Sequence, residues 1–254
     1  MTVHFVGAGP GAADLITLRA AQLLAAADVV LYPGTYLDAA VLSHCRPEAR
    51  LVDTQDLDLD QITAVVVGAA RDGLDVVRLT SGDPSLYSAL AEQTARLDAA
   101  GVTWDVTPGV PSYAAAAALV GRELTVPLLT QSVVLTRAQA RSTAMPSTEA
   151  LANFAATRAT LVLHLAITRI RELAESLTSD YGAECPVAVV YRASQPGELI
   201  LRGTLADIAD QVEGAELRQA AIILVGPALD PAAVAGSWLY TPDRDRSLKQ
   251  VGRT

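Results

Sequence analysis

The chain has 254 residues, of which 51% are hydrophobic and 4% aromatic, and its formal net charge at pH 7 is −9. A chain of this length and apolar content can bury the core of one large globular domain or of two small ones. The acidic charge and the scarcity of aromatic residues argue against a nucleic-acid partner, because phosphate backbones are bound by clustered positive charge and single-stranded bases by stacked aromatic rings.

Cysteine and histidine residues are few, and none of their spacings is typical of a metal site. Cys45 and Cys185 form no C-x-x-C pair, and we expect both to be buried thiols. His4, His44 and His164 form no H-x-x-H pair, so we expect no metal. The sequence has neither a secretory signal pattern nor a run of ~20 apolar residues, which predicts a cytoplasmic protein with no membrane partner.

The first half of the chain alternates short apolar runs with helical patterns. Strands are predicted at 3–6, 29–32, 76–79 and 102–106, and helices at 15–27, 62–70, 86–100 and 114–119. This alternation predicts a mainly parallel sheet with helices on both faces. Asp83 and Pro84 have the residue types of an N-cap and a first helical position, so they predict the start of the third helix.

After the predicted helix at 114–119 the apolar pattern is interrupted at Gly121-Arg122-Glu123, and the second half then repeats the alternation of strands and helices. We therefore expect two α/β domains, at 1–122 and 123–254. Strands are predicted at 133–136, 160–165, 187–190, 198–201 and 222–225, and helices at 167–177 and 205–212. Thr204 and Asp207 resemble a capping box at the start of the last helix.

Three loops rich in glycine and proline each follow an apolar run of the first half. Their sequences are Gly7-Ala8-Gly9-Pro10-Gly11, Ser81-Gly82-Asp83-Pro84 and Thr107-Pro108-Gly109-Val110-Pro111-Ser112. In open α/β sheets small molecules bind beyond the carboxyl ends of the strands, where glycine lets a ligand approach the backbone. The loops therefore predict a small-molecule site.

The first loop, taken alone, fits the G-x-G-x-x-G/A pattern of dinucleotide-binding proteins. A nicotinamide- or flavin-dependent oxidoreductase is therefore one hypothesis. Two features argue against it: Pro10 removes an amide from the loop, and the second strand ends at Tyr32-Pro33-Gly34 without the acidic residue that would bind a ribose. A catalytically silent scaffold is a third hypothesis.

Taken together, the loops resemble those of the tetrapyrrole methylases of the cobalamin and sirohaem pathways. The resemblance includes Leu15-Ile16-Thr17 and 27–32 and extends over almost the whole chain. Within the family, the stretches 32–35, 114–125, 131–137 and 186–194 are similar to the branch that methylates precorrin-4 at C-11. The uroporphyrinogen methylases of the family have an Asp where this chain has Pro33, which argues against uroporphyrinogen as the substrate.

The resemblance implies a two-domain α/β methyltransferase with a mainly parallel sheet in the first domain and a mixed sheet in the second. It implies a homodimer that binds S-adenosylmethionine between the domains, with the corrin precursor beside it. By match of motif, the residues at the S-adenosylmethionine site would be Pro10, Ser81, Gly82, Asp83, Leu86, Pro111, Ser112, Leu165 and Ala193. The catalytic residue stays unknown, because the sequence offers no obvious general base.

The substrate that the resemblance implies carries many carboxylates, whereas the chain is acidic. Binding should then depend on a local basic patch, and arginine pairs well with carboxylates. Arg137 and Arg141 are the first candidates for substrate binding, and Arg122 and Arg192 are second candidates. His164 lies within an apolar run, and we expect it to be a packed histidine.

Overall fold

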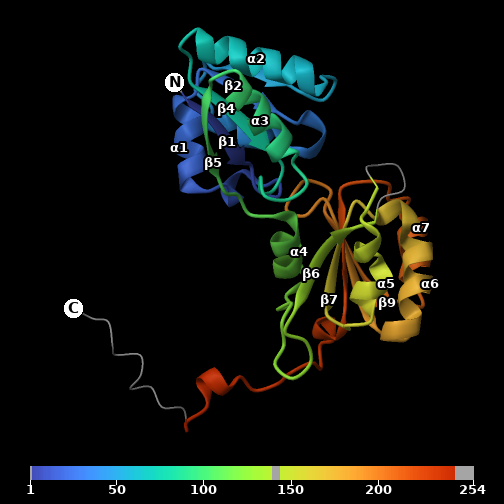
Figure 1. The fold of residues 1–254 in the computed structure, drawn as a ribbon. Coiled ribbons are helices and arrows are strands. Elements are labelled where there is room, and N and C mark those ends of the chain that lie inside the picture. Colours follow the sequence, from blue (N-terminus) through green and yellow to red (C-terminus); the bar gives the residue numbers. More distant parts are fainter. Residues whose placement is uncertain (1, 139–143, 244–254) are drawn as a thin grey trace. The chain divides into compact units, whose positions relative to one another are not determined.

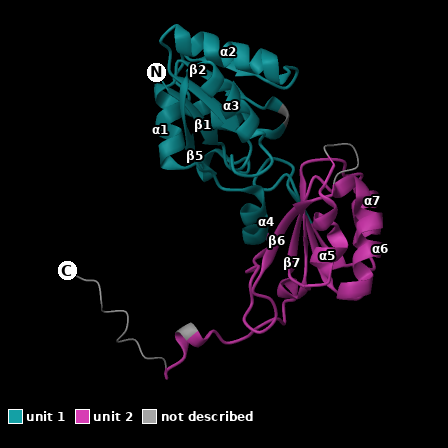
Figure 2. Cartoon of the chain, viewed as in Figure 1, with its two compact units in different colours: residues 1–119, 190–200 teal, residues 120–189, 201–254 magenta. Residues whose placement is uncertain are grey.

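The computed structural model describes residues 2–138 and 144–243. The chain forms two compact units, unit 1 with residues 1–119 and 190–200 and unit 2 with residues 120–189 and 201–254 (Figure 2). The predicted boundary at 122/123 lies close to the division at 119/120, but residues 190–200 group with unit 1. Compactness alone does not show that a unit folds by itself, so the domains 1–122 and 123–254 stay a prediction.

Unit 1 contains a five-stranded parallel sheet with the strand order β3-β2-β4-β1-β5 (Figure 1). The strands are β1 (Thr2–Gly7), β2 (Val29–Tyr32), β3 (Arg50–Asp53), β4 (Val76–Thr80) and β5 (Thr103–Thr107). The predicted parallel sheet is confirmed, and only β3 has no counterpart among the predicted strands. Because all five strands are parallel, their carboxyl ends lie along one edge of the sheet.

Three helices cover the two faces of this sheet: α1 (Leu18–Ala26), α2 (Leu59–Arg71) and α3 (Leu90–Ala99). Leu24 of α1 belongs to one buried cluster, on the face that carries Val30 and Leu79. Val66 of α2 and Leu97 of α3 belong to the other cluster. The alternation of side chains along the buried strands thus supplies two apolar layers, as a sheet covered on both faces requires.

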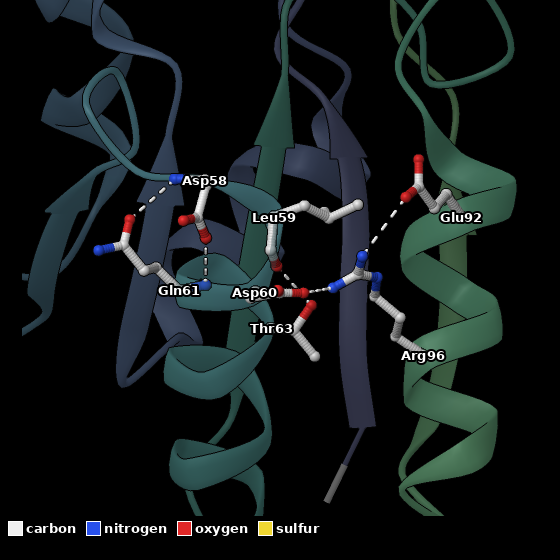
Figure 3. A network of polar contacts seen from close by, with 7 residues as sticks. All are labelled: Asp58, Leu59, Asp60, Gln61, Thr63, Glu92 and Arg96. Carbon is white, nitrogen blue, oxygen red and sulfur yellow. Dashed lines mark hydrogen bonds and ion pairs between the residues drawn. The ribbon is translucent and has the colours of Figure 1, made fainter.

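Polar contacts fix the start of α2 and join it to α3 (Figure 3). Asp58 and Gln61 form a reciprocal capping box, in which the Asp58 carboxylate accepts from the backbone amide of Gln61 at 2.8 Å. Arg96 of α3 forms ion pairs with Asp60 of α2 and with Glu92 of α3. These contacts are exposed, so each one contributes little stability compared with the buried clusters.

Unit 2 contains a mixed five-stranded sheet with the order β6-β7-β10-β8-β9, in which β6 and β7 are parallel and β7 and β10 antiparallel. Its strands are β6 (Val133–Arg137), β7 (Thr160–His164), β8 (Pro186–Tyr191), β9 (Leu199–Thr204) and β10 (Ala221–Val225). Its helices are α5 (Leu151–Ala155), α6 (Ile170–Tyr181) and α7 (Ile208–Gly214). The helix α4 (Ser112–Val120) crosses the division between the units. The predicted mixed sheet is confirmed.

Two local predictions, one in each unit, are wrong in detail. Thr204 and Asp207 form only half of a capping box: the Asp207 carboxylate accepts from the backbone amide of Thr204 at 2.6 Å, but the Thr204 hydroxyl donates to that carboxylate at 3.2 Å and does not accept from the Asp207 amide. The helix α7 begins at Ile208, with Asp207 as its N-cap residue. Cys185 is buried as expected, whereas Cys45 is partly exposed. No helix in the described part of the chain is long and apolar enough to cross a membrane.

Candidate functional site

Three loops of unit 1 lie together at the carboxyl edge of its sheet: the β1 loop (residues 8–12), the β4 loop (residues 81–89) and the β5 loop (residues 108–111). β4 and β5 both pair with β1, so the β1 loop lies between the other two. Gly9 and Gly82 exchange backbone hydrogen bonds of 2.8 and 3.2 Å, and the amide of Ala8 donates to the carbonyl of Thr80 at 2.8 Å. The loops predicted from the sequence therefore form one cluster.

Glycine allows the backbones of these loops to approach one another. A β-carbon on Gly7 would lie 2.5 Å from the Gly109 nitrogen and 2.7 Å from the Gly82 oxygen, which no side chain tolerates. From the sequence, these glycines are predicted to be places where a ligand approaches the backbone. The structure shows that at Gly7 and Gly109 the close neighbour is another loop, so these glycines shape the edge on which a ligand would lie.

Asp83 connects the β4 loop to the β5 loop. Its Oδ2 accepts from the amide of Gly109 at 2.8 Å, and its Oδ1 accepts from the amide of Ser85 at 2.8 Å and from the Ser85 hydroxyl. Partial burial acts to raise the pKa of Asp83, but the hydrogen bonds from Ser85 and Gly109 outweigh it and hold the pKa below its ordinary value. Asp83 is therefore ionised at neutral pH.

The prediction that Asp83 is a helix N-cap is wrong. α3 begins at Leu90, after Ala89 in a left-handed conformation with φ 53°. Residues 84–88 form turns instead, because the Asp83 carboxylate binds the Ser85 amide and the carbonyl of Asp83 accepts from the amide of Leu86 at 3.2 Å. Tyr87 also has a positive φ, of 53°, so the β4 loop contains two strained non-glycine residues.

The segment 190–200 packs on the β1 loop, although it follows β8 near the end of the chain. The side-chain amide of Gln195 donates to the carbonyl of Pro10 at 2.8 Å, and the Ser194 hydroxyl accepts from the amide of Ala12 at 3.1 Å. Gly11 leaves room for Gln195, since a β-carbon there would lie 2.6 Å from Cδ of Gln195. Gln195 is a site residue that could not be predicted from the sequence, because nothing local indicates a contact across 185 residues.

The predicted cofactor residues of unit 1 fall within this cluster. Pro10 is buried, Ser81 is exposed, and Leu86 is half-buried one turn beyond Asp83. A β-carbon on Gly82 would lie 3.6 Å from Cα of Pro111 and from the nitrogen of Ser112, so these three residues are neighbours. Ala193 is buried in the segment that covers the β1 loop. The structure thus brings together eight of the nine predicted cofactor residues.

The remaining predicted residues belong to unit 2. Arg137 and His164 end the parallel strands β6 and β7 in register, and Leu165 follows with φ 53° and 48% exposure. Burial lowers the pKa of His164 to about 4, so this histidine is neutral at pH 7, consistent with a packed residue. Arg141 lies outside the described residues.

The loop cluster offers groups of several kinds at one edge. It combines an ionised carboxylate in Asp83, an exposed hydroxyl in Ser81 and an apolar side chain in Leu86 with backbone that is fixed by hydrogen bonds. Such a surface suits a small amphipathic molecule better than a polyanion, because the loops present a carboxylate and no basic side chain. Among the described residues, no group of three or more His, Cys, Asp or Glu side chains lies close enough to hold a metal ion.

The family model and the similar proteins of known function indicate the same family. Residues 2–209 match the family described as Tetrapyrrole (Corrin/Porphyrin) Methylases. The chain is 51% identical to a precorrin-4 C(11)-methyltransferase of Rhodococcus erythropolis, over 97% of this chain and 99% of that protein.

Two solved structures are similar over nearly the whole chain. The structure of a cobalt precorrin-4 methyltransferase has a TM-score of 0.87 and 38% identity, and the similarity covers 91% of this chain and 96% of that one. A uroporphyrin-III C-methyltransferase from Thermus thermophilus, solved in complex with S-adenosylhomocysteine, has a TM-score of 0.76 and 30% identity, covering 90% of this chain and 99% of that one.

Proposed function

The chain belongs to the tetrapyrrole (corrin/porphyrin) methylase family, and we propose that it transfers the methyl group of S-adenosylmethionine to C-11 of precorrin-4, giving precorrin-5 in cobalamin biosynthesis. The proposal is supported by 51% identity over 97% of the chain to a protein of that activity. One structural observation carries it further. The predicted cofactor residues of unit 1, which come from four separate stretches of sequence, lie in one loop cluster.

The chemistry of the cluster fits S-adenosylmethionine. This molecule combines a nucleoside, an amino acid and a positively charged sulfonium, and it supplies an electrophilic methyl group when it is bound. The ionised carboxylate of Asp83 would favour a cation at this edge, and Leu86 and Pro111 would pack on the apolar parts of the nucleoside. We propose Pro10, Ser81, Gly82, Asp83, Leu86, Pro111, Ser112, Leu165 and Ala193 as the cofactor-binding residues.

The dinucleotide alternative is weakened by the same geometry. In a dinucleotide fold the glycine loop opens directly into a helix, whose amides bind the pyrophosphate. Here α1 begins only at Leu18, capped by Thr17, whose side chain accepts from the amide of Ala20. The side chain of Gln195 occupies the space above Gly11 that a pyrophosphate would need. The β1 loop is followed by a 3-10 turn at Ala13–Leu15, and not directly by an α-helix whose amides could bind the pyrophosphate of a nicotinamide or flavin dinucleotide.

Methyl transfer to carbon asks for positioning more than for a catalytic nucleophile. The reduced macrocycle supplies the electron pair for the new carbon–carbon bond, while the bond between sulfur and the methyl group breaks and S-adenosylhomocysteine leaves with that electron pair. Alignment of the two reactants is worth on the order of 7–11 kcal/mol. The rigid ties among the loops, from Gly9 to Gly82 and from Asp83 to Gly109, would hold the methyl donor in one orientation. These ties support a role of the chain in orienting the donor.

The carboxylates of the macrocycle need a basic partner, and we propose Arg137 and Arg141 for this role. Arg137 ends β6 and is half-buried, which places its guanidinium at the carboxyl edge of the parallel pair β6–β7. A guanidinium binds a carboxylate through two parallel hydrogen bonds, so arginine suits this substrate better than lysine.

We further propose that the protein is a homodimer. Several large apolar side chains of unit 2 are highly exposed: Leu128 at 96%, Val234 at 86% and Trp238 at 66%. Exposed apolar surface of this kind is typical of regions that pack on another chain. Light scattering at micromolar concentration should give the mass of two chains, and the mass of one chain would contradict the proposal.

Two measurements test the proposed activity. Calorimetry should detect binding of S-adenosylhomocysteine and none of NAD. Incubation with S-adenosylmethionine and either precorrin-4 or its cobalt complex, followed by mass spectrometry and NMR, should give a product with one added methyl group at C-11. Binding of NAD would favour an oxidoreductase, and failure of both ligands to bind would favour a scaffold without catalytic activity.

A further inference from the structure

Arg78 is a buried cation that the proposed reaction does not use. It lies in the middle of β4, is only 8% exposed, and shares a sheet face with Val76 and Thr80, which lie two residues before and two residues after it. Its Nε donates to Oε1 of Gln93 at 3.2 Å, and its Nη1 donates to the hydroxyl of Thr54 at 3.3 Å and to the carbonyl of Leu79 at 3.0 Å. Within residues 2–138 and 144–243, no carboxylate forms an ion pair with this guanidinium.

Burial of a charge among neutral groups is costly, so the arrangement calls for a reason. Burial lowers the pKa of Arg78 to about 10, which leaves the side chain charged at neutral pH. An apolar side chain of similar size would fill the same space without that cost. The guanidinium contributes what an apolar group cannot, namely three hydrogen bonds with fixed directions.

Those hydrogen bonds lead to the β4 loop. Gln93, itself only 7% exposed, uses its side-chain oxygen for Arg78 and its side-chain nitrogen for the carbonyls of Ser88, at 3.0 Å, and Ala89, at 3.5 Å. The Ser88 hydroxyl in turn donates to the carbonyl of Pro84. A continuous chain of hydrogen bonds thus runs from the strand to the residue that follows Asp83.

The part of the loop that this chain reaches is strained. Ala89 and Tyr87 both have φ 53°, a conformation that costs a non-glycine residue about 1 kcal/mol or more. Such a loop keeps its shape only where its surroundings determine it. The orientation of the Gln93 amide decides which carbonyls are held, and Arg78 decides that orientation, because a guanidinium can bind only the oxygen of the amide.

We infer that Arg78 is a positioning residue which, through Gln93, sets the conformation of the β4 loop and thereby the affinity for the methyl donor. The inference rests on the proposed function, since it takes the β4 loop as part of the S-adenosylmethionine site. Arg78 itself is not assigned any contact with the donor or the macrocycle. Its second contact, with Thr54, whose hydroxyl donates to the carbonyl of Tyr32 at 3.1 Å, extends the same control to the end of β2.

The variant Gln93→Glu separates positioning from packing. A glutamate keeps an oxygen for Arg78 and adds an ion pair, so the thermal stability should stay close to that of the wild type. It has no N–H group for the carbonyls of Ser88 and Ala89, so the β4 loop should lose its anchor. The dissociation constant for S-adenosylhomocysteine, measured by calorimetry, should rise about three- to tenfold or more, as expected when the hydrogen bonds to the carbonyls of Ser88 and Ala89 are both lost. Amide hydrogen exchange at residues 85–89 should become faster.

The variant Arg78→Met tests the other end of the chain. It should weaken S-adenosylhomocysteine binding to a similar extent as Gln93→Glu, and the double variant should be no weaker than the more affected single one, because both act on the same element. Arg78→Lys keeps the charge but cannot hold Gln93 and Leu79 together, so it should rescue only in part. Glu92→Gln, an exposed change at the neighbouring position of α3, is the matched control and should bind like the wild type.

The outcomes are distinguishable from failure of the proposed function. If the wild type does not bind S-adenosylhomocysteine, the proposed function fails first. If the wild type binds and Gln93→Glu binds equally well with unchanged exchange at residues 85–89, the positioning role is wrong. With precorrin-4 as the varied substrate at saturating S-adenosylmethionine, KM should stay unchanged in Gln93→Glu, and a selective rise in that KM would also overturn the inference.

Discussion

Asp83 and Gly109 are joined across the end of β1: the Asp83 Oδ2 atom lies 2.8 Å from the Gly109 nitrogen, although the strands β4 and β5 that precede them do not pair with each other. β1 lies between β4 and β5, so the hydrogen bond between Asp83 and Gly109 bridges the loops that follow its two neighbouring strands. The bridge uses an ionised acceptor, which makes hydrogen bonds of this kind about twice as strong as neutral ones.

Asp83→Asn should break this bridge while keeping the local turn. The Asn oxygen can still accept from Ser85, but an NH₂ group facing the Gly109 amide would set donor against donor. We expect the free energy of unfolding to fall by about 1–3 kcal/mol, as for a lost hydrogen bond to a charged group, and S-adenosylhomocysteine binding to weaken by roughly tenfold or more. Asp56→Asn, in the exposed loop after β3, serves as the control. Equal affinity in both variants would show that the bridge does not shape the cofactor site.

Gly7→Ala and Gly109→Ala should be among the most destabilising single changes in unit 1. The added β-carbon on Gly7 would meet the backbone of Gly109 at 2.5 Å, and backbone cannot move aside as a flexible side chain can. Thermal unfolding should show a loss of about 2 kcal/mol or more. Gly68→Ala is the opposite case, because its β-carbon would meet nothing within 4 Å in the middle of α2. It should stabilise by about 0.5–1 kcal/mol.

Gln195→Ala should loosen the 190–200 segment from the β1 loop, since it removes the hydrogen bond to the Pro10 carbonyl. We expect faster amide exchange at residues 10–12 and weaker S-adenosylhomocysteine binding. It should not confer NAD binding, because α1 still begins too far along the chain to present its amides. Pro10→Gly, which adds an amide to the β1 loop, should likewise leave NAD unbound. NAD binding by the wild type or by either variant would contradict the methyltransferase assignment.

Arg137→Ala should raise KM for precorrin-4 with little effect on S-adenosylhomocysteine affinity. The effect should shrink at high salt, because ions screen exposed charge interactions. Arg218→Ala changes an exposed arginine of the same unit and serves as the control. Wild-type kinetics at low salt in Arg137→Ala would show that this residue does not bind the substrate.

His164 should make folding stability depend on pH between about 6.5 and 4. The pKa of His164 is lowered by burial from 6.5 to about 4 in the folded protein, so on acidification the unfolded chain binds a proton first. The free energy of unfolding therefore falls as the pH drops through this window and levels off below it, by an amount on the order of 3 kcal/mol or less. His164→Gln should flatten this part of the profile relative to the wild type. Parallel wild-type and His164→Gln profiles would contradict the assignment.

The elements that could be predicted are those whose signal lies in a local pattern. β1, β2 and β4 have buried side chains on both faces and read as short, mainly apolar runs, whereas β3 is an edge strand with mostly exposed side chains and gives no such run. Asp83 and Pro84 have the residue types of a helix start, but the Asp83 carboxylate accepts hydrogen bonds from the backbone amides of Ser85 and Gly109 and caps no helix. The competing partner at Gly109 is distant in sequence, so no local rule could exclude the helix.

The site divides in the same way. The glycine and proline loops are visible in the sequence because turns require those residues, and motif resemblance picks out Ala193 in a stretch that has no such signal. Gln195, two residues further on, and the buried pair Arg78 and Gln93 are polar residues whose roles depend on what the fold places opposite them. Of these three residues, only Arg78 has a local signal in the sequence, because it is a charged residue within an apolar strand.

The contact between Pro10 and Gln195 has a consequence for how the protein is made. A ribosome adds about 5–20 residues per second, so the 185 residues between them take roughly 10–40 s to synthesise. The last strand of the unit 1 sheet, β5, is complete when Thr107 has been added. The β1 loop therefore stays uncovered until the segment 190–200 has been made. A nascent chain arrested between Thr107 and Gln195 would carry all five strands of the first sheet with an open β1 loop, a state that the finished chain no longer presents.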